Sequence, residues 1–199
     1  MLRSVTSQRR TPRALSSVLG AFLVAGSLAL PLVASAAGLL DVSYRQLAGK
    51  EQVNLAQRYH GRVLLVVNTA SKCGFTPQYE ALEALQKNYS PRGLSVLGFP
   101  SNDFKGQEPG DEKDIQDFCT LTYGVKFPMF EKVHVIGDQA TPLYKGLTAA
   151  TGVAPGWNFH KYLIGRDGKV IAQFPSKVKP DAPELVAAIE RALAAPAGH

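Results

Sequence analysis

A short, unbroken apolar run limits the possible folds of this chain more than any other feature. Residues 63–68, Val-Leu-Leu-Val-Val-Asn, do not alternate between polar and apolar side chains. This pattern is typical of a strand buried on both faces of a sheet that helices cover. A second such run spans 94–99, and Thr76-Pro77 between the two has the chemistry of a helix start. We therefore expect a strand, a helix from about Pro77 to Tyr89, and a second buried strand.

The remainder of the chain continues this alternation of strands and helices. The patterns predict a helix capped by Asp111, a strand over 133–136, a hairpin formed by 162–164 and 169–174, and a final amphipathic helix through 185–193. Early alternation followed by a hairpin and a helix predicts an α/β fold with a mixed central β-sheet flanked by helices.

The first 36 residues predict a secretory signal, which leaves 37–199 as the folded domain. A leader with four Arg and no acid is followed by an apolar run over 18–33, and Ala34-Ser35-Ala36 offers a small-residue cleavage site. The alternative is an uncleaved membrane anchor, which Pro31 and the small residues make less suitable. Arg9-Arg10 leaves twin-arginine and general export both open. We expect an exported, periplasmic protein.

The charge of the chain belongs largely to this leader. Removing its four Arg lowers the formal net charge from +6 to +2 (6 minus 4). The mature domain has no basic stripe interleaved with aromatic residues, so no nucleic-acid partner is expected.

The two cysteines, Cys73 and Cys119, are not at Cys-x-x-Cys spacing, and no ligand cluster at zinc spacing accompanies them. They are therefore either a structural bridge or a redox pair. Cys73 lies between a buried strand and a helix N-terminus, beside Lys72. Unpaired amides and the helix dipole favour a thiolate there. The alternative is a small cysteine buried in the core.

Three segments, in order, resemble the glutathione peroxidase family in its cysteine form. They are residues 68–79 around Cys73, residues 97–110, and Gly156-Trp-Asn-Phe159, and the resemblance extends from about residue 40 to residue 193. It implies a thioredoxin-like fold and the reduction of hydrogen peroxide and organic hydroperoxides, with no cofactor and no metal. It also implies a catalytic set, which consists of Cys73, Gln107, Trp157 and Asn158.

The chemistry of these side chains agrees with the roles that the resemblance implies. Two amides and an indole N–H are neutral donors, which can stabilise an anionic sulfur without competing for its proton. Each also has a structural alternative. Trp157 could belong to the core, Asn158 could cap a turn, and Gln107 could lie in a solvated loop.

Cys119 corresponds to the resolving cysteine of family members that use thioredoxin. The resemblance therefore implies that Cys119 condenses with a Cys73 sulfenic acid, and that a thioredoxin-like protein, or glutathione, then reduces the disulfide. The alternative is a core residue, because Cys119 shares a helical stripe with Ile115 and Phe118.

Several neighbouring positions depart from the common family pattern or carry no expected role. Ser101 replaces a frequent cysteine, and Asp103 and Lys105 stand where Gln and Gly are usual. His160 is expected at the surface. The segment between Asp138 and Trp157 is short, like that of members without the loop that supports tetramers, so a monomer is expected.

Two other functions remain as alternatives to a peroxidase. A periplasmic thiol–disulfide oxidoreductase on the same fold would need a cysteine where the chain has Thr76. A redox-inert binding module would instead carry a structural bridge between Cys73 and Cys119.

Overall fold

The computed structural model of this protein describes residues 1–2 and 38–196. The signal predicted over 1–36 therefore lies outside the described residues, apart from Met1 and Leu2. Among the helices that the structure does describe, none has the length and apolar character needed to cross a membrane.

A mixed four-stranded sheet forms the centre of the domain. Its strand order is β4 (Leu94–Pro100), β3 (Val63–Thr69), β5 (Lys161–Ile164) and β6 (Val170–Phe174). β3 runs parallel to β4, whereas β5 is antiparallel to both β3 and β6. All residues of β3 and β4 are buried, as expected for strands covered on both faces. The predicted mixed sheet and the β5–β6 hairpin are confirmed.

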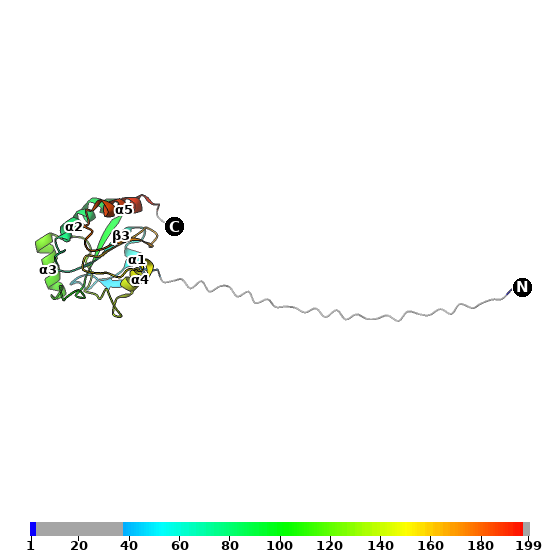
Figure 1. Cartoon of the computed structure of the whole chain (residues 1–199), viewed down its shortest axis with the longest axis horizontal. Helices are drawn as coiled ribbons and strands as arrows, with labels where there is room; N and C mark the ends of the chain where they lie inside the picture. Colours follow the sequence, from blue (N-terminus) through cyan, green and yellow to red (C-terminus); the bar gives the residue numbers. More distant parts are fainter. Residues whose placement is uncertain (3–37, 197–199) are drawn as a thin grey trace. The chain divides into compact units, whose positions relative to one another are not determined.

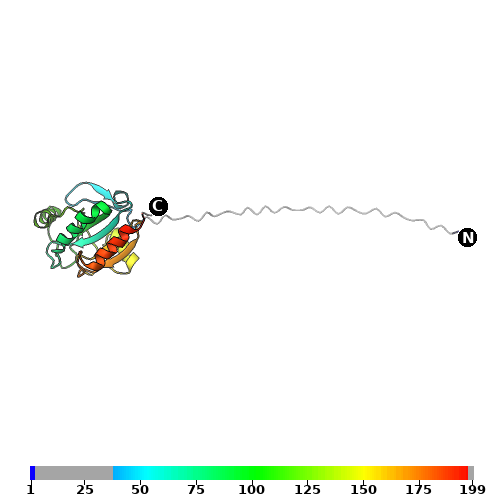
Figure 2. The same ribbon diagram turned by 90° about the horizontal axis from the view of Figure 1, so that it is seen from above.

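Helices cover both faces of this sheet, and alternate residues of β3 divide the core into two clusters. Leu65 and Val67 pack with the residues of α2 and α5, while Leu64 and Val66 pack with those of α1 and α4. Figure 2 shows α2 and α5 side by side over the sheet, and α3 lies beside α2 at its edge (Figure 1). The elements outside the main sheet are β1 (Ser43–Arg45), β2 (Gln52–Asn54), α1 (Leu55–Arg58), α2 (Gln78–Tyr89), η1 (Ser90–Arg92), α3 (Glu112–Tyr123), α4 (Pro142–Thr151) and α5 (Pro183–Ala194).

The start of α2 differs from the predicted cap. The helix begins at Gln78, after Pro77, and Thr76 does not cap it. Instead the Thr76 hydroxyl accepts the N–H of Cys73 at 3.0 Å and donates to the Ala70 carbonyl at 2.9 Å. The threonine is used to close the loop between β3 and α2, which is the loop that carries Cys73.

Both ends of α3 are defined by local chemistry. Asp111 and Asp114 form a reciprocal capping box at the N-terminus, so the predicted cap is confirmed. At the C-terminus Gly124 has φ 61° and ψ 29°, a left-handed conformation that glycine adopts at little cost.

The strand predicted over 133–136 is wrong. The amides of Val135 and Ile136 donate to the Asp103 carboxylate, at 2.6 Å and 3.3 Å, rather than to a neighbouring strand. Val133 and Val135 are still buried, which explains the strand-like pattern. The ribbon of β1 and β2 and the helices α1 and α4 were not predicted, because they are short or weakly patterned.

Candidate active site

Cys73 lies in the loop that joins β3 to α2, at the N-terminal end of the helix. The residue is buried, with 8% of its surface exposed, and its sulfur accepts the N–H of Phe75 at 3.4 Å. The sulfur therefore lies at the N-terminal end of α2, where the Phe75 N–H points at it. This is the local arrangement expected from the sequence.

Gln107 and Asn158 meet directly beside this loop. The side-chain amide of Asn158 donates to the side-chain oxygen of Gln107 at 2.9 Å. The backbone carbonyl of Gln107 accepts the backbone N–H of Lys72 at 3.0 Å. Because the Gln107 oxygen is occupied, its NH₂ group is the end left to donate to a ligand. Asn158 is completely buried and bonds to Gln107, so it does not serve as a turn cap.

Trp157 is positioned by the carboxyl end of β3. The side chain of Asn68 donates to the Trp157 carbonyl at 3.1 Å, and the backbone carbonyl of Asn68 accepts the N–H of Phe159 at 2.6 Å. The indole is half-buried and contacts both core clusters, with the Phe104 ring 5.5 Å away. The side chain therefore has a packing role whatever else it does.

Two of the three departures from the family pattern, Asp103 and Lys105, have local explanations. The Asp103 carboxylate bonds to His134 and to two backbone amides, which fixes the loop before Gln107. Lys105 has φ 53°, in the left-handed region where glycine is favoured, and its amine lies 5.8 Å from the centre of the Trp157 ring. A cation thus stands over the indole at the site.

Cys119 lies on α3, four residues before the helix ends, and is 2% exposed. Burial raises the pKa of its thiol to about 11, although the neighbouring Tyr79 hydroxyl lowers it. Both cysteines are free thiols in this structure and belong to one hydrophobic cluster. The structure therefore contains no bridge between them, and Cys119 would react slowly from its place in the helix.

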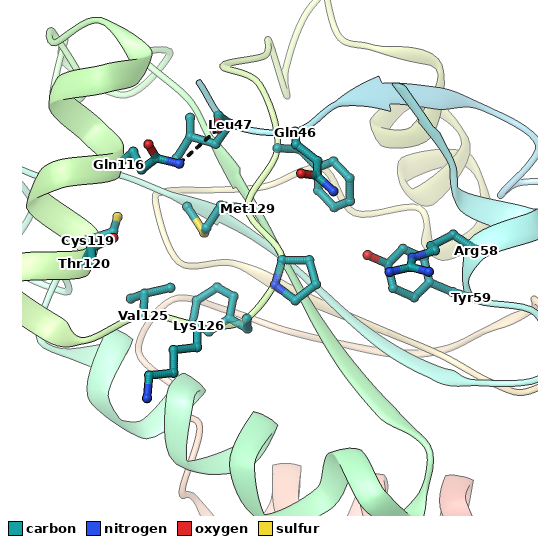
Figure 3. A pocket seen from close by; sticks show the side chains of 13 residues that line it. Gln46, Leu47, Arg58, Tyr59, Gln116, Cys119, Thr120, Val125, Lys126 and Met129 are labelled. Atoms are coloured by element: carbon teal, nitrogen blue, oxygen red, sulfur yellow. Dashed lines mark hydrogen bonds between the residues drawn. The ribbon is translucent and has the colours of Figure 1, made fainter. Parts of the chain in front are cut away.

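Cys119 also borders a pocket of about 320 Å³ on the flank of α3. The pocket has Leu47, Phe127 and Met129 among its apolar walls and Arg58 and Lys126 among its polar ones. Figure 3 looks into this pocket and shows Cys119 and Thr120 on the α3 side.

The expectation for His160 is wrong. The side chain is buried, with 2% exposed, and its ring lies 4.8 Å from that of Tyr162. Burial, together with the charge of Lys161, lowers the pKa of His160 to about 4, so the imidazole is neutral. Its ring packs against Tyr162, which belongs to one core cluster, whereas Phe159 belongs to the other.

Sequence reasoning missed a buried lysine at the start of β5. Lys161 has no exposed surface, and its amine donates to the side-chain oxygen of Gln78 and to the Val178 carbonyl. Gln78 in turn donates to the Ser176 carbonyl at 2.7 Å. Burial lowers the pKa of Lys161 to about 7. A lysine that follows Trp157 and Asn158 at the start of a short strand offered no signal of this burial.

The fold and this loop define a class of proteins, namely thiol redox proteins with a thioredoxin-like fold. A crystal structure of a thiol:disulfide interchange protein from Chlorobium tepidum matches with a TM-score of 0.57, covering 76% of this chain and 92% of the other. At 17% identity this likeness concerns the fold alone. The predicted thioredoxin-like α/β fold is confirmed.

Comparisons of the sequence identify the family more closely. The sequence model of the family described as "Glutathione peroxidase" matches residues 39–148. "Thioredoxin/glutathione peroxidase BtuE" of Escherichia coli (strain K12) is 46% identical over 167 residues, or 72% of this chain and 91% of the relative. "Hydroperoxy fatty acid reductase gpx1" of Synechocystis is 50% identical over 148 residues, or 68% and 85%. The solved structure "Trgpx in apo form" is 39% identical, with a TM-score of 0.64, and the match covers 81% and 99%.

The chain belongs to the glutathione peroxidase family. It is a thiol peroxidase, an enzyme that reduces hydroperoxides with electrons from a thiol reductant.

Proposed function

We propose that Cys73 is the peroxidatic residue of this enzyme and that Gln107, Trp157 and Asn158 stabilise its thiolate. The thiolate attacks the terminal oxygen of a hydroperoxide, an alcohol or water leaves, and a sulfenic acid remains on Cys73. The observation that carries this proposal is the amide network beside Cys73. It holds Gln107 with its NH₂ group available, while the Phe75 amide already donates to the sulfur.

Neutral donors suit this reaction better than charged ones. A negative charge passes from the attacking sulfur to the departing oxygen, and preorganised N–H groups can stabilise it at both positions. A nearby acid would instead keep the sulfur protonated. The neutral state of His160 is consistent with a site that uses amide and indole donors.

Cys119 is the resolving residue in this proposal. Its thiol condenses with the sulfenic acid, which releases water and leaves a disulfide between Cys73 and Cys119. The two sulfurs are not joined in the described structure, and Cys119 is held within α3, so the C-terminal part of that helix has to open first. The nearby C-terminus of α3 makes such an opening local.

The reductant in this proposal is a thioredoxin-like protein, with glutathione as the second candidate. The name of the Escherichia coli relative mentions both. Lipid hydroperoxides are proposed as substrates beside hydrogen peroxide, and the name of the Synechocystis relative refers to hydroperoxy fatty acids. A thiol–disulfide oxidoreductase is less well supported, because the position for a second active-site cysteine holds Thr76, whose hydroxyl closes the loop.

A pair of cysteine variants tests the assignment. When one equivalent of peroxide is added, Cys73→Ser should show no rapid loss of peroxide. Cys119→Ser should consume one equivalent and retain a sulfenic acid that dimedone traps. In steady state with a thioredoxin, Cys119→Ser should lose most of its turnover. Full turnover by Cys119→Ser would remove the resolving role, and rapid consumption by Cys73→Ser would remove the peroxidatic one.

Location and assembly are the remaining parts of the proposal. The basic leader, apolar run and Ala34-Ser35-Ala36 support export to the periplasm with removal of residues 1–36. The N-terminal sequence of the protein recovered from the periplasmic fraction tests this. A monomer is proposed because the segment between Asp138 and Trp157 is short and α4 occupies half of it. Light scattering should then give the mass of one chain.

A further inference from the structure

Glu108, the neighbour of Gln107, is a buried acid that the proposed cycle does not yet use. Only 1% of its surface is exposed, and its Oε2 atom has no hydrogen-bond partner among the described residues. Its backbone is held firmly, since its N–H donates to Asn102 at 2.8 Å and its carbonyl accepts from the Lys132 amine at 3.2 Å. Lys132 therefore binds the backbone of Glu108 rather than its carboxylate. A buried carboxyl with one oxygen left unpaired is costly and calls for a functional reason.

The position of Glu108 connects the two cysteine-bearing segments. It lines a cavity of about 360 Å³ together with the two residues that precede Cys73 and with Phe118, the neighbour of Cys119. Its charge also contributes to the raised pKa of the Cys119 thiol, so the carboxylate lies within electrostatic range of that sulfur. Glu108 thus lies beside residues that neighbour each cysteine in the sequence.

The surroundings of Glu108 shift its titration towards neutrality. Burial raises the pKa of its carboxyl above the usual value. Hydrogen bonds with Ser71 and the charges of Lys132 and Lys72 lower the pKa and only partly offset the effect of burial. An acid whose pKa is nearer to neutral is better matched to exchange protons at physiological pH. The titratable and charged groups around it are Lys72 from the active-site loop, Asp114 and Cys119 from α3, Tyr79 from α2 and Lys132 from the segment after α3.

We propose that Glu108 is the proton relay for disulfide formation between Cys119 and oxidised Cys73. This inference rests on the proposed function, which supplies the sulfenic acid and the resolving thiol. In the step, the Cys119 sulfur forms a bond to the Cys73 sulfur while the bond between that sulfur and its hydroxyl oxygen breaks. The Glu108 carboxylate takes the Cys119 proton and delivers it to the departing hydroxide. Water leaves and the carboxylate is regenerated, so atoms and charge balance.

This role explains how a thiol that is largely protonated at neutral pH can react. Burial raises the pKa of the Cys119 thiol to about 11 within α3, and even a solvent-exposed cysteine has a pKa of about 8.5, so the thiolate is the minor form in either state. Removing the proton during the attack avoids forming the free thiolate first, and general base catalysis of this kind contributes about 100-fold or more. The peroxide step does not involve the Cys119 proton, so it does not need Glu108.

The experiment follows one turnover of the full-length reduced protein with one equivalent of hydrogen peroxide. Peroxide loss reports the first step, and quenched samples counted for free thiols report the disulfide step. Glu108→Gln keeps the shape of the side chain but cannot accept a proton. Glu80→Gln, an exposed acid on α2, is the matched control for loss of one negative charge.

We expect Glu108→Gln to slow the disulfide step by about 100-fold while peroxide loss stays within a few-fold of the wild type. The wild-type disulfide rate should also rise with pH through one group with a pKa above 4.5, and Glu108→Gln should lose this dependence. Glu80→Gln should behave as the wild type. Glu108→Asp, which keeps a carboxylate, should retain part of the rate.

Three results would overturn the inference. The first is an unchanged disulfide rate in Glu108→Gln. The second is equal slowing of both steps, which indicates a purely structural role. The third is a wild-type disulfide rate that does not depend on pH in the acid range. This test uses the wild type alone, so it does not depend on any variant folding. If the wild type forms no disulfide with Cys119, the proposed function itself fails, and that outcome is visible before any Glu108 variant is made.

Discussion

Replacing Gly124 with Ala should speed disulfide formation between Cys119 and Cys73. Gly124 ends α3 with φ 61°, and its N–H donates to the carbonyls of Cys119 and Thr120. The N–H of Val125 also donates to the Cys119 carbonyl, at 3.1 Å. The left-handed turn at Gly124 therefore holds the backbone of the resolving cysteine itself.

The expected acceleration of the disulfide step follows from the backbone strain alone. A Cβ placed on Gly124 meets no atom within 4 Å, so alanine adds no clash. An L-residue in the left-handed region costs about 1 kcal/mol. If that strain is relieved when the end of α3 opens, the open population rises about fivefold. Because Cys119 is 2% exposed in the helix, the disulfide step should accelerate by the same factor.

Rapid mixing of the reduced enzyme with one equivalent of peroxide measures this step by free-thiol counting. Emission from Trp157, the only Trp of the chain, gives a second signal. Gly124→Asn is the matched control, because Asn tolerates the left-handed conformation better, and its effect should be smaller. Urea unfolding establishes that Gly124→Ala has introduced the strain. An unchanged or slower disulfide rate in a variant destabilised by about 1 kcal/mol would refute the reasoning.

Three further predictions concern the site and the buried lysine. Gln107→Ala should lower the second-order rate constant of Cys73 with peroxide by about 100-fold, measured by stopped-flow competition, since it removes an aimed donor; an unaffected rate would contradict the donor role. Asn158→Ala should give a smaller loss in the same assay, because the Asn158 amide already donates to Gln107 and so stabilises the thiolate partly through Gln107; a loss larger than that of Gln107→Ala would contradict this order. The pKa of Lys161 is about 7 in the folded chain and 10.5 as the reference value, so the unfolded chain binds one more proton above pH 7. Stability should therefore rise by about 1 kcal/mol per pH unit from pH 7 to about pH 9 and be independent of this group below pH 7. Lys161→Met should reduce that slope in urea titrations, and an identical slope would contradict it.

The local environment of Cys73 could be predicted because it depends on neighbouring residues. A buried apolar strand, a loop with glycine and a helix start follow one another within the segment from Val63 to Gln78, and short-range patterning is sufficient to place a cysteine between them. The cap at Asp111 could be predicted for the same reason, since a capping box involves residues three positions apart.

The errors arose where distant residues decide the outcome. The segment 133–136 has the pattern of a strand, but Asp103, some thirty residues away, takes two of its backbone amides. His160 looks like a surface residue beside Asn158, yet it is buried with its ring against that of Tyr162. Neither partner could be inferred from the local sequence.

The sequence by itself determined the alternating order of the strands and helices around the sheet, the junction that carries Cys73, and the set of side chains that the family resemblance singles out. Only the tertiary structure decided how they meet. The bond between Asn158 and Gln107, the burial of Lys161 and the position of Glu108 between the two cysteine-bearing segments each join residues far apart in the chain. Periodicity and capping act over a few residues, whereas the burial and pairing of polar groups depend on which elements pack together.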